Sequence, residues 1–352
     1  MKYALLLTLS VSSYTFARSP YILETELESF SYSDISPIKQ LIDDLEGPAI
    51  SRGDHAFSHN QWTASIKNQG VGVHVFSRLD YLFEFNPDTA QLLYLDKNNQ
   101  AVGQDENYTV DLQVNALRAS GFAISYEYQL KGHVIAARLN RLFSTYMLEG
   151  GIEGSVSTSA EGFQGDLSLN YNYARDSLLK RPQEPIDGKG YSLDLDWQWQ
   201  VSERVTLVAK ARDLWSKMDW DVTYTIANAT TDTLSYDEDG TLSAIPVLSG
   251  IESRHDYVQR LPKRLHLNAG WDVDQHWQVA ARLMWIDRYP YHSVAVARQL
   301  GDMRVELNYN LISQGLGAKI DFTYGYLGVQ ADHVDIDKTH GLAVTAGLKY
   351  QF

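Results

Sequence analysis

Residues 191–201 read Tyr-Ser-Leu-Asp-Leu-Asp-Trp-Gln-Trp-Gln-Val, and this stretch decides the fold. Apolar side chains at every second position alternate with hydroxyl, carboxylate and amide side chains. That alternation is the pattern of a β-strand with one apolar and one polar face. The polar face carries two full charges, Asp194 and Asp196, in the middle of the strand, and aromatic rings lie near both ends of the apolar face.

The same period of two recurs along most of the chain. It is found in residues 107–117, 121–130, 163–173, 204–212, 265–273, 276–286, 303–310, 316–324 and 341–352. Strands in soluble sheets usually have about five or six residues, whereas a tilted strand needs about 9–11 to cross a bilayer. Most of these segments have the greater length. An open sheet would leave backbone groups unpaired in lipid, so the pattern predicts an all-β fold, a closed antiparallel transmembrane β-barrel.

The spacing of these segments predicts about 16 strands beginning near Asn60. Fourteen or eighteen strands are the alternatives, because residues 217–248 can hold a further hairpin. Long connections at 174–189, 214–262, 287–290 and 332–341 are expected to face outward, whereas residues 85–106 fall on the periplasmic side in this count. Tight periplasmic turns are expected at Lys131-Gly132, Ala160-Glu161, Ser202-Glu203, Asp274-Gln275, Leu300-Gly301-Asp302 and Gly325.

The first 59 residues differ from the rest. The N-terminus has the layout of a secretory signal peptide: a positive start at Met1-Lys2, a short apolar stretch, and a small-residue cleavage site at Thr15-Phe16-Ala17. This layout predicts removal of residues 1–17. Residues 37–45 have the apolar spacing of a short amphipathic helix. We therefore expect residues 18–59 to form a plug-like or periplasmic segment, or a helix packed on the barrel mouth, and residues 60–352 to form the barrel.

Composition excludes several classes of protein. The chain has 352 residues, a formal net charge of −14 and no cysteine. A mean hydropathy of −0.30 without an internal apolar run of about 18 residues excludes a bundle of transmembrane helices. The acidic balance argues against a nucleic-acid partner, since binding to phosphates requires cations. The absence of cysteine excludes disulfide scaffolds and thiol chemistry.

The last strand narrows the cellular location. Residues 342–352 end with Thr345, Gly347, Tyr350 and the terminal Phe352 on an alternating segment. This ending resembles the insertion signal of bacterial, Gram-negative outer-membrane β-barrel proteins of the porin-like kind, although no single family is identified. The resemblance implies an outer-membrane location and two kinds of partner: the barrel-insertion machinery and outer-membrane lipid with lipopolysaccharide.

Alternation also predicts which charged side chains face the barrel interior. Acids and bases are nearly balanced among them, and about sixteen strands would enclose a lumen too wide for side chains to fill. We therefore expect a water-filled, charged lumen. The predicted lumen-lining residues are Arg78, Asp80, Glu84, Asp111, Glu127, Arg138, Asp166, Asp194, Asp196, Lys210, Arg212, Asp272, Arg282, Arg304, Glu306, Lys319, Asp321 and Lys349.

Catalytic and metal sites have weaker signals. The pairs His255-Asp256, His292-Ser293 and Asp332-His333 lack a spacing that requires catalysis, and a nucleophile elbow is missing from the sequence. Two acidic groups, residues 237–239 and the set Asp332, Asp335 and Asp337, lack the full spacing of known calcium loops. No catalytic residue, metal or cofactor is therefore expected.

Three functions remain open at this stage. The first is a passive channel for small polar solutes or ions. The second is an accessory barrel that anchors or exports a surface polymer or appendage, with residues 18–59 and 214–262 as docking segments. The third is a membrane-embedded hydrolase that would use a histidine at the rim.

Overall fold

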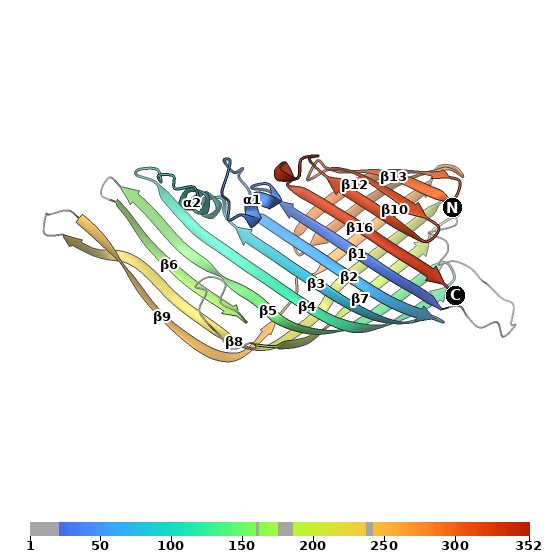
Figure 1. Cartoon of the computed structure of the whole chain (residues 1–352), viewed down its shortest axis with the longest axis horizontal. Helices are drawn as coiled ribbons and strands as arrows, with labels where there is room; N and C mark the ends of the chain where they lie inside the picture. The colour runs from blue at the N-terminus through green and yellow to red at the C-terminus, as the bar shows by residue number, and fades with distance from the viewer. Residues whose placement is uncertain (1–20, 160–161, 175–185, 237–241) are drawn as a thin grey trace.

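The computed structural model describes residues 21–159, 162–174, 186–236 and 242–352. Within these ranges sixteen strands belong to one antiparallel sheet (Figure 1). The predicted signal peptide, residues 1–17, and the acidic residues 237–239 lie outside the described residues. Neither described α-helix is long and apolar enough to cross a membrane.

Fourteen of the described strands close into a ring, because β8 pairs with both β7 and β10. The ring also closes through pairing of β1 with β16 and of β5 with β7. Its strands are β1 (Ile22–Ser33), β2 (His55–Asn68), β3 (Val71–Phe85), β4 (Asn107–Leu130), β5 (His133–Ser159), β7 (Gly188–Gln200), β8 (Val205–Tyr236), β10 (Arg264–Asp272), β11 (Trp277–Ile286), β12 (Tyr289–Leu300), β13 (Met303–Asn310), β14 (Leu316–Phe322), β15 (Gly325–Ala331) and β16 (Gly341–Gln351).

Two further strands, β6 (Gly162–Tyr173) and β9 (Leu242–Gln259), lie outside the ring. The distal half of β5 pairs with β6, and the distal half of β8 pairs with both β6 and β9. These segments form an extension that projects past the ring, at the left of Figure 1. The predicted number of about 16 therefore matches the strands of the sheet, whereas the barrel itself has the alternative number, fourteen.

Gly150 marks the start of this extension. Its φ is +141°, and a Cβ there would lie 2.2 Å from the backbone oxygen of Asn170 on β6. Only glycine accepts both that conformation and so close an approach of the neighbouring strand. β5 can therefore leave β7 and continue beside β6.

The termini and the short turns occupy one end of the barrel. The predicted turns at residues 131–132, 202–203, 274–275, 300–302 and 325 are all at this end, which by the usual asymmetry of such barrels faces the periplasm. Residues 160–161, where a further periplasmic turn was predicted, lie outside the described residues, and the strands on either side of them, β5 and β6, meet at the opposite end of the barrel. Residues 86–106, which hold α2 (Pro87–Lys97), also lie at the opposite end, and their predicted periplasmic location is wrong.

The expected boundary at residue 60 is also wrong. β1 pairs with β16 and β2 over its whole length, so residues 22–33 are part of the barrel wall. The predicted helix is α1 (Ile38–Ile42), in the connection between β1 and β2. It lies on the outer rim, where Ile35 and Leu45 pack against Phe85 and Ala90, and Lys39 forms an exposed ion pair with Asp337 beside the short helix η1 (Ile336–Lys338).

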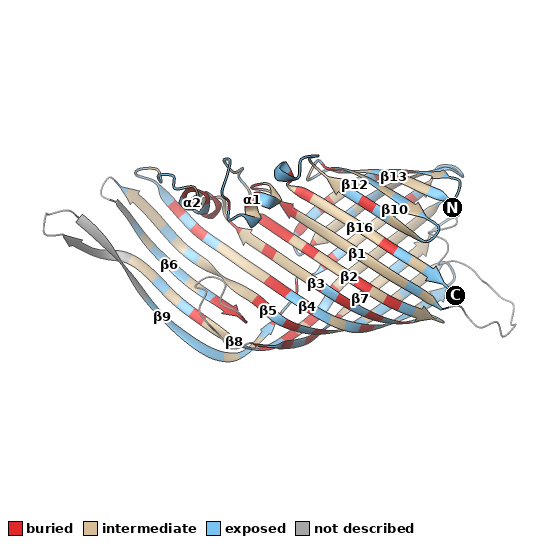
Figure 2. Ribbon diagram, viewed as in Figure 1, coloured by how far each residue is buried: buried red, intermediate tan, exposed pale blue. Residues whose placement is uncertain are grey.

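Exposed and buried residues alternate along the ring strands (Figure 2). The exposed residues are mostly apolar, as the period of two predicts, and include Leu139, Ile124, Leu307, Leu327, Leu348 and Tyr350. A contiguous belt of exposed apolar side chains on a closed barrel requires a lipid environment. The four residues of the C-terminal signal divide between the faces: Tyr350 and Phe352 are exposed on the outer wall, whereas Thr345 and Gly347 lie at inward positions of β16.

Candidate functional site: the barrel interior and its outer mouth

The predicted lumen charges fall into two groups. Asp111 and Asp166 are exposed on the extension, beyond the ring, and do not line the lumen. Their strands keep the alternation but continue past the barrel, which the sequence pattern does not reveal. The others lie on the wall face opposite the exposed apolar belt: Arg78, Asp80, Glu84, Glu127, Arg138, Asp194, Asp196, Lys210, Arg212, Asp272, Arg282, Arg304, Glu306, Lys319, Asp321 and Lys349.

Many of these inward charges form ion pairs, either between neighbouring strands, across one intervening strand or along the same strand. Arg138 Nη2 lies 2.6 Å from Asp194 Oδ2, and Arg282 Nη2 lies 2.7 Å from Glu306 Oε2. Further pairs join Arg212 to Asp196, Arg304 and Lys319 to Asp321, and Lys67 and Lys349 to Glu24. Charges that are partly withdrawn from water are retained here because each has a partner of opposite sign.

One group of charges crosses the lumen. Arg78 on β3 binds Asp213 on β8 through two hydrogen bonds of 2.9 and 2.8 Å, although β4, β5 and β7 separate these strands in the ring. Arg264 Nη2 lies 3.2 Å from the same carboxylate, and Asp194 accepts the backbone N–H of Asp213 at 2.9 Å. We call Arg78, Asp80, Asp194, Asp213 and Arg264 the cross-lumen cluster. At this level side chains from strands that three others separate meet across the interior, so paired charges fill part of the lumen here.

Nearer the outer end, aromatic side chains also cross the interior. The His55 Nε2 atom on β2 lies 2.6 Å from the hydroxyl of Tyr291 on β12, and the rings of Phe57 and Tyr291 pack edge to face at 5.1 Å. Tyr32 and Tyr289 complete this group. β12 and β2 are separated by five strands in the ring, so the barrel is narrow along this direction.

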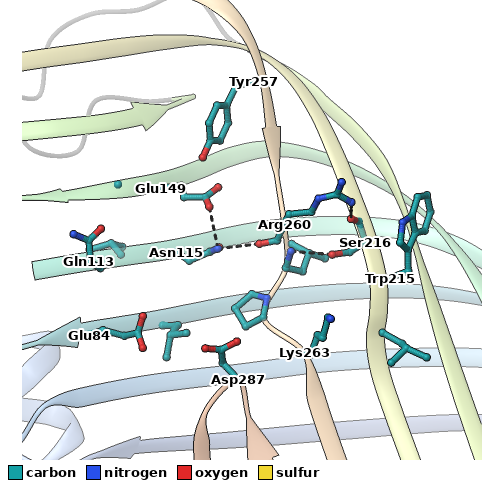
Figure 3. A pocket seen from close by; sticks show the side chains of 16 residues that line it. Glu84, Gln113, Asn115, Glu149, Trp215, Ser216, Tyr257, Arg260, Lys263 and Asp287 are labelled. Atoms are coloured by element: carbon teal, nitrogen blue, oxygen red, sulfur yellow. Dashed lines mark hydrogen bonds between the residues drawn. The ribbon is translucent and has the colours of Figure 1, made fainter.

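A cavity of about 840 Å³ lies at the outer mouth, above the cross-lumen cluster. Its apolar wall includes Leu82, Val114 and Leu261, and its polar groups include Glu149, Asn115 and Arg260 (Figure 3). Outward-facing Trp215 lines the same cavity, because β8 leaves β10 after Arg212 and turns to pair with β9. A mixed lining of this kind is typical of sites for small amphipathic molecules.

A bulge places Glu149 in this cavity. The pairing of β4 and β5 shifts between Arg118 and Ala119, and the Ser144 hydroxyl donates to the Arg118 carbonyl at the shift. Beyond it, Glu149 lies opposite Asn115, whose amide contacts the Glu149 carboxylate at 3.4 Å and donates to the Arg260 carbonyl at 2.9 Å. The Tyr257 hydroxyl points toward the same carboxyl group (Figure 3).

Glu149 lies above the membrane, since β5 begins at His133 and about 9–11 residues suffice to cross. Burial raises the pKa of its carboxyl to about 7, and the Tyr257 hydroxyl offsets part of that rise. The charged groups that face the cavity are Glu84, Arg260, Lys263 and Asp287, and no described cation forms an ion pair with Glu149. A carboxyl that titrates near neutral pH in a cavity is a common feature of functional sites.

We expect the substitution Glu149→Gln to change how stability depends on pH. The raised folded pKa means that the wild-type stability is full below about pH 4.5, falls as the pH rises from there through about 7, and levels off above that. The amide has no charge to bury, so the variant should be more stable than the wild type at pH 8, by about 1–2 kcal/mol, and equal to it at pH 4.5. Urea unfolding in detergent at both pH values measures this difference, and an advantage of equal size at both would contradict the assignment.

Several charged residues of the barrel interior were not predicted from the sequence. Glu24, Glu26 and Glu28 occupy inward positions of β1, and their strict alternation with Leu23, Thr25 and Leu27 was a readable signal. Asp213 and Glu149 had no such signal, because each follows an irregularity of pairing that shifts the alternation.

One group of two carboxylates and an imidazole at the rim has the side chains that a metal ion could bind. Ligand atoms of Asp34, Asp54 and His55 lie within 4.8 Å of one another. These atoms already bind one another, since the Asp34 carboxylate accepts the backbone N–H of Asp54 and His55 Nδ1 lies 2.6 Å from Asp54 Oδ1. Burial would raise the pKa of the Asp34 carboxyl, but its hydrogen bonds with His55 and Asp54 hold it below the ordinary value.

The other acidic and histidine candidates do not converge. Asp332 accepts the backbone N–H groups of His340 and Gly341, whereas Asp337 pairs with Lys39. His333 Nδ1 accepts the backbone N–H of Asp335 and makes no described contact with the Asp332 carboxylate. His292 lies at an outward position of β12 and Ser293 at an inward one. These pairs therefore offer no catalytic dyad.

The closed ring, the exposed apolar belt and the inward charges decide the class of protein. The chain is an outer-membrane β-barrel protein. No family model and no curated protein matches it. Solved structures with similarity to this barrel include the toluene transporter TodX of Pseudomonas putida (11% identity, 99% of this chain and 93% of that chain, TM-score 0.42) and the toluene transporter TbuX of Ralstonia pickettii (10%, 96% and 90%, TM-score 0.42).

A mutant of the monoaromatic hydrocarbon channel TodX has 12% identity and a TM-score of 0.47, with 96% of this chain and 91% of that chain covered. The outer-membrane protease OmpT of Escherichia coli is less similar, with 11% identity and a TM-score of 0.26. The assignment of this chain to the outer-membrane β-barrel proteins rests on the strand pairing and the exposed apolar belt described above.

Proposed function

We propose that this outer-membrane barrel is a passive channel for small solutes that enter at the cavity of the outer mouth. The observation that carries the proposal is the continuity of polar groups from that cavity into the ring. Glu149 and Asn115 line the cavity, and the cross-lumen cluster and the ladder of ion pairs follow toward the periplasm. A lining of balanced charges favours the passage of polar solutes over that of hydrocarbons.

The cross-lumen cluster would narrow the proposed passage. A solute that passes this level would require the contact between Arg78 and Asp213 to separate, since these side chains meet across the interior. The mixed lining of the cavity favours a solute that has an apolar body and a hydrogen-bonding group. Selection of the solute would therefore occur at the outer mouth, and the charged lumen would set the preference among ions and polar molecules.

The absence of cysteine allows a direct test of the entry site. Leu214→Cys places one thiol in the cavity lining, and a bulky maleimide attached there should reduce uptake of small amphipathic solutes into proteoliposomes at least fivefold. The matched control is Ile251→Cys, because Ile251 is 74% exposed on the extension, and labelling there should leave uptake unchanged. Uptake equal to that of empty liposomes would exclude a channel, and uptake unaffected by the Leu214 label would exclude this entry site.

A second candidate is the accessory barrel that binds a surface polymer or appendage. The extension favours it, because β9 pairs only with β8 among the described strands and leaves its other edge open. Residues 214–262, the predicted docking segment, are not free as a whole to bind a partner, because Met218, Trp220 and Leu261 pack in the core at the barrel mouth. Proteoliposomes without solute uptake would favour this candidate over the channel.

A further inference from the structure

The outer wall of the barrel carries a compact group of cations beside aromatic rings. Arg141 on β5 lies opposite Tyr191 on β7, and Tyr191 lies opposite Lys217 on β8. Lys189 precedes Tyr191 on the same face of β7, and Trp215 precedes Lys217 on β8. We call Arg141, Lys189, Tyr191, Trp215 and Lys217 the basic–aromatic patch.

The rings hold the cations against the wall. The Arg141 guanidinium lies 4.9 Å from the centre of the Tyr191 ring and 5.3 Å from that of Phe143, and it donates to the Gly190 carbonyl at 3.3 Å. The rings of Tyr191 and Trp215 stack at 6.2 Å with an interplanar angle of 7°. Cation–π contacts orient the guanidinium and leave its remaining donors available to a ligand.

The charge balance of the patch differs from that of the lumen. Inside the barrel most cations are paired with a carboxylate, as in the pairs of Arg138 and Arg282 described above. On the patch, Lys217 pairs with Asp219 at 2.6 Å, whereas neither Arg141 nor Lys189 forms an ion pair with a carboxylate among the described residues. The patch therefore has three cations and one facing carboxylate, that of Asp219, which also lies opposite Lys189, on a chain whose net charge is −14.

The depth of the patch indicates what lies beside it. On the outer face of β7, Trp197 and Trp199 lie at the periplasmic end, and Tyr191 lies at the opposite end, with the apolar belt between them. Lys189 is one step beyond Tyr191, at the height of the outer headgroups. Basic residues at this height next to lipid attract anionic headgroups.

We propose that the basic–aromatic patch binds the phosphate of a phosphorylated lipid in the outer leaflet. The Arg141 guanidinium would bind two phosphate oxygens, and Lys189 and Lys217 would add charge at its sides. Tyr191, Trp215 and Phe143 contact the acyl chains below the headgroup. The three cations of the patch lie on the wall and are not part of the cavity lining, which the patch shares only at Trp215, so phosphate binding does not depend on the proposed transport function.

Native mass spectrometry of the full mature protein in an uncharged detergent tests the proposal. The probes are a bis-phosphorylated lipid A, the same lipid without phosphates, and inorganic phosphate. The double variant Arg141→Gln with Lys189→Gln should bind the phosphorylated lipid at least tenfold more weakly than the wild type. If the double variant does not fold, the single variant Lys189→Gln replaces it in the test, because Lys189 is exposed at the end of its strand. This single variant should weaken lipid binding about threefold.

The matched control is Arg298→Gln. Arg298 also lies over an aromatic ring on the outer wall, 5.2 Å from the centre of Trp277, but near the periplasmic end. Its substitution should change lipid affinity less than twofold. Equal binding of the lipid without phosphates, or unchanged affinity in both patch variants, would overturn the proposal. Binding of inorganic phosphate with the affinity of the lipid would also overturn it, because the site would then recognise free phosphate.

Discussion

Replacement of Asp213 by asparagine is expected to lower the free energy of unfolding by about 3–5 kcal/mol, the range for breaking a buried ion pair. The Asp213 side chain is fully buried and is shared by two guanidinium groups, those of Arg78 and Arg264, of which Arg78 also pairs with Asp80. The amide would leave both positive charges without their shared partner. The backbone φ of Asp213 is +52°, a conformation that asparagine also tolerates, so the substitution removes charge without adding backbone strain.

The measurement is urea unfolding in detergent at pH 7, followed by tryptophan fluorescence. Asp221→Asn is the matched control, because the ion pair of Asp221 with Arg254 is exposed and should contribute at most about 1 kcal/mol. The Asp213 variant should also pass solutes faster, since loss of the carboxylate removes the contact with Arg78 across the interior. A loss of stability no greater than that of the control would show that the cross-lumen cluster does not hold the barrel together.

Substitution of Leu307 by arginine is expected to destabilise the barrel by about 2–4 kcal/mol in lipid bilayers. Leu307 lies near the middle of β13 on the outer wall and is 58% exposed. An arginine there would place a charge against the acyl chains near the centre of the membrane. Reversible unfolding in phospholipid bilayers measures the cost.

Leu316→Arg provides the comparison for depth. Leu316 is the first residue of β14, lies on the same outer wall at the outer end, and is 72% exposed. Near the interface the same substitution should cost only about 0–1 kcal/mol. If both arginine variants had the same stability, the outer wall would not lie in a membrane gradient, and the assignment of the apolar face to lipid would be wrong.

The alternation of residues was sufficient to predict the class of fold and the side chains on each face. Trp197 and Leu307 are exposed on the wall, and Arg138 and Glu306 lie on the opposite face, because side chains of a strand alternate wherever pairing is regular. The boundary at residue 60 failed although the pattern of β1 was readable. The pairing of β1 with β16 and β2 places its alternating glutamates on the inward face of the wall.

Tertiary structure decided which strands close the ring and which side chains meet across it. Asp111 and Asp166 continue a regular alternation but lie on the extension, since Gly150 lets β5 leave the ring. Asp213 reaches Arg78 across the interior because both side chains point inward from strands that β4, β5 and β7 separate. Local sequence determines the face on which a side chain lies, because that depends on a period of two along one strand. Contacts across the lumen depend on closure and bulges that involve strands far apart in the chain, and those are properties of the whole sheet.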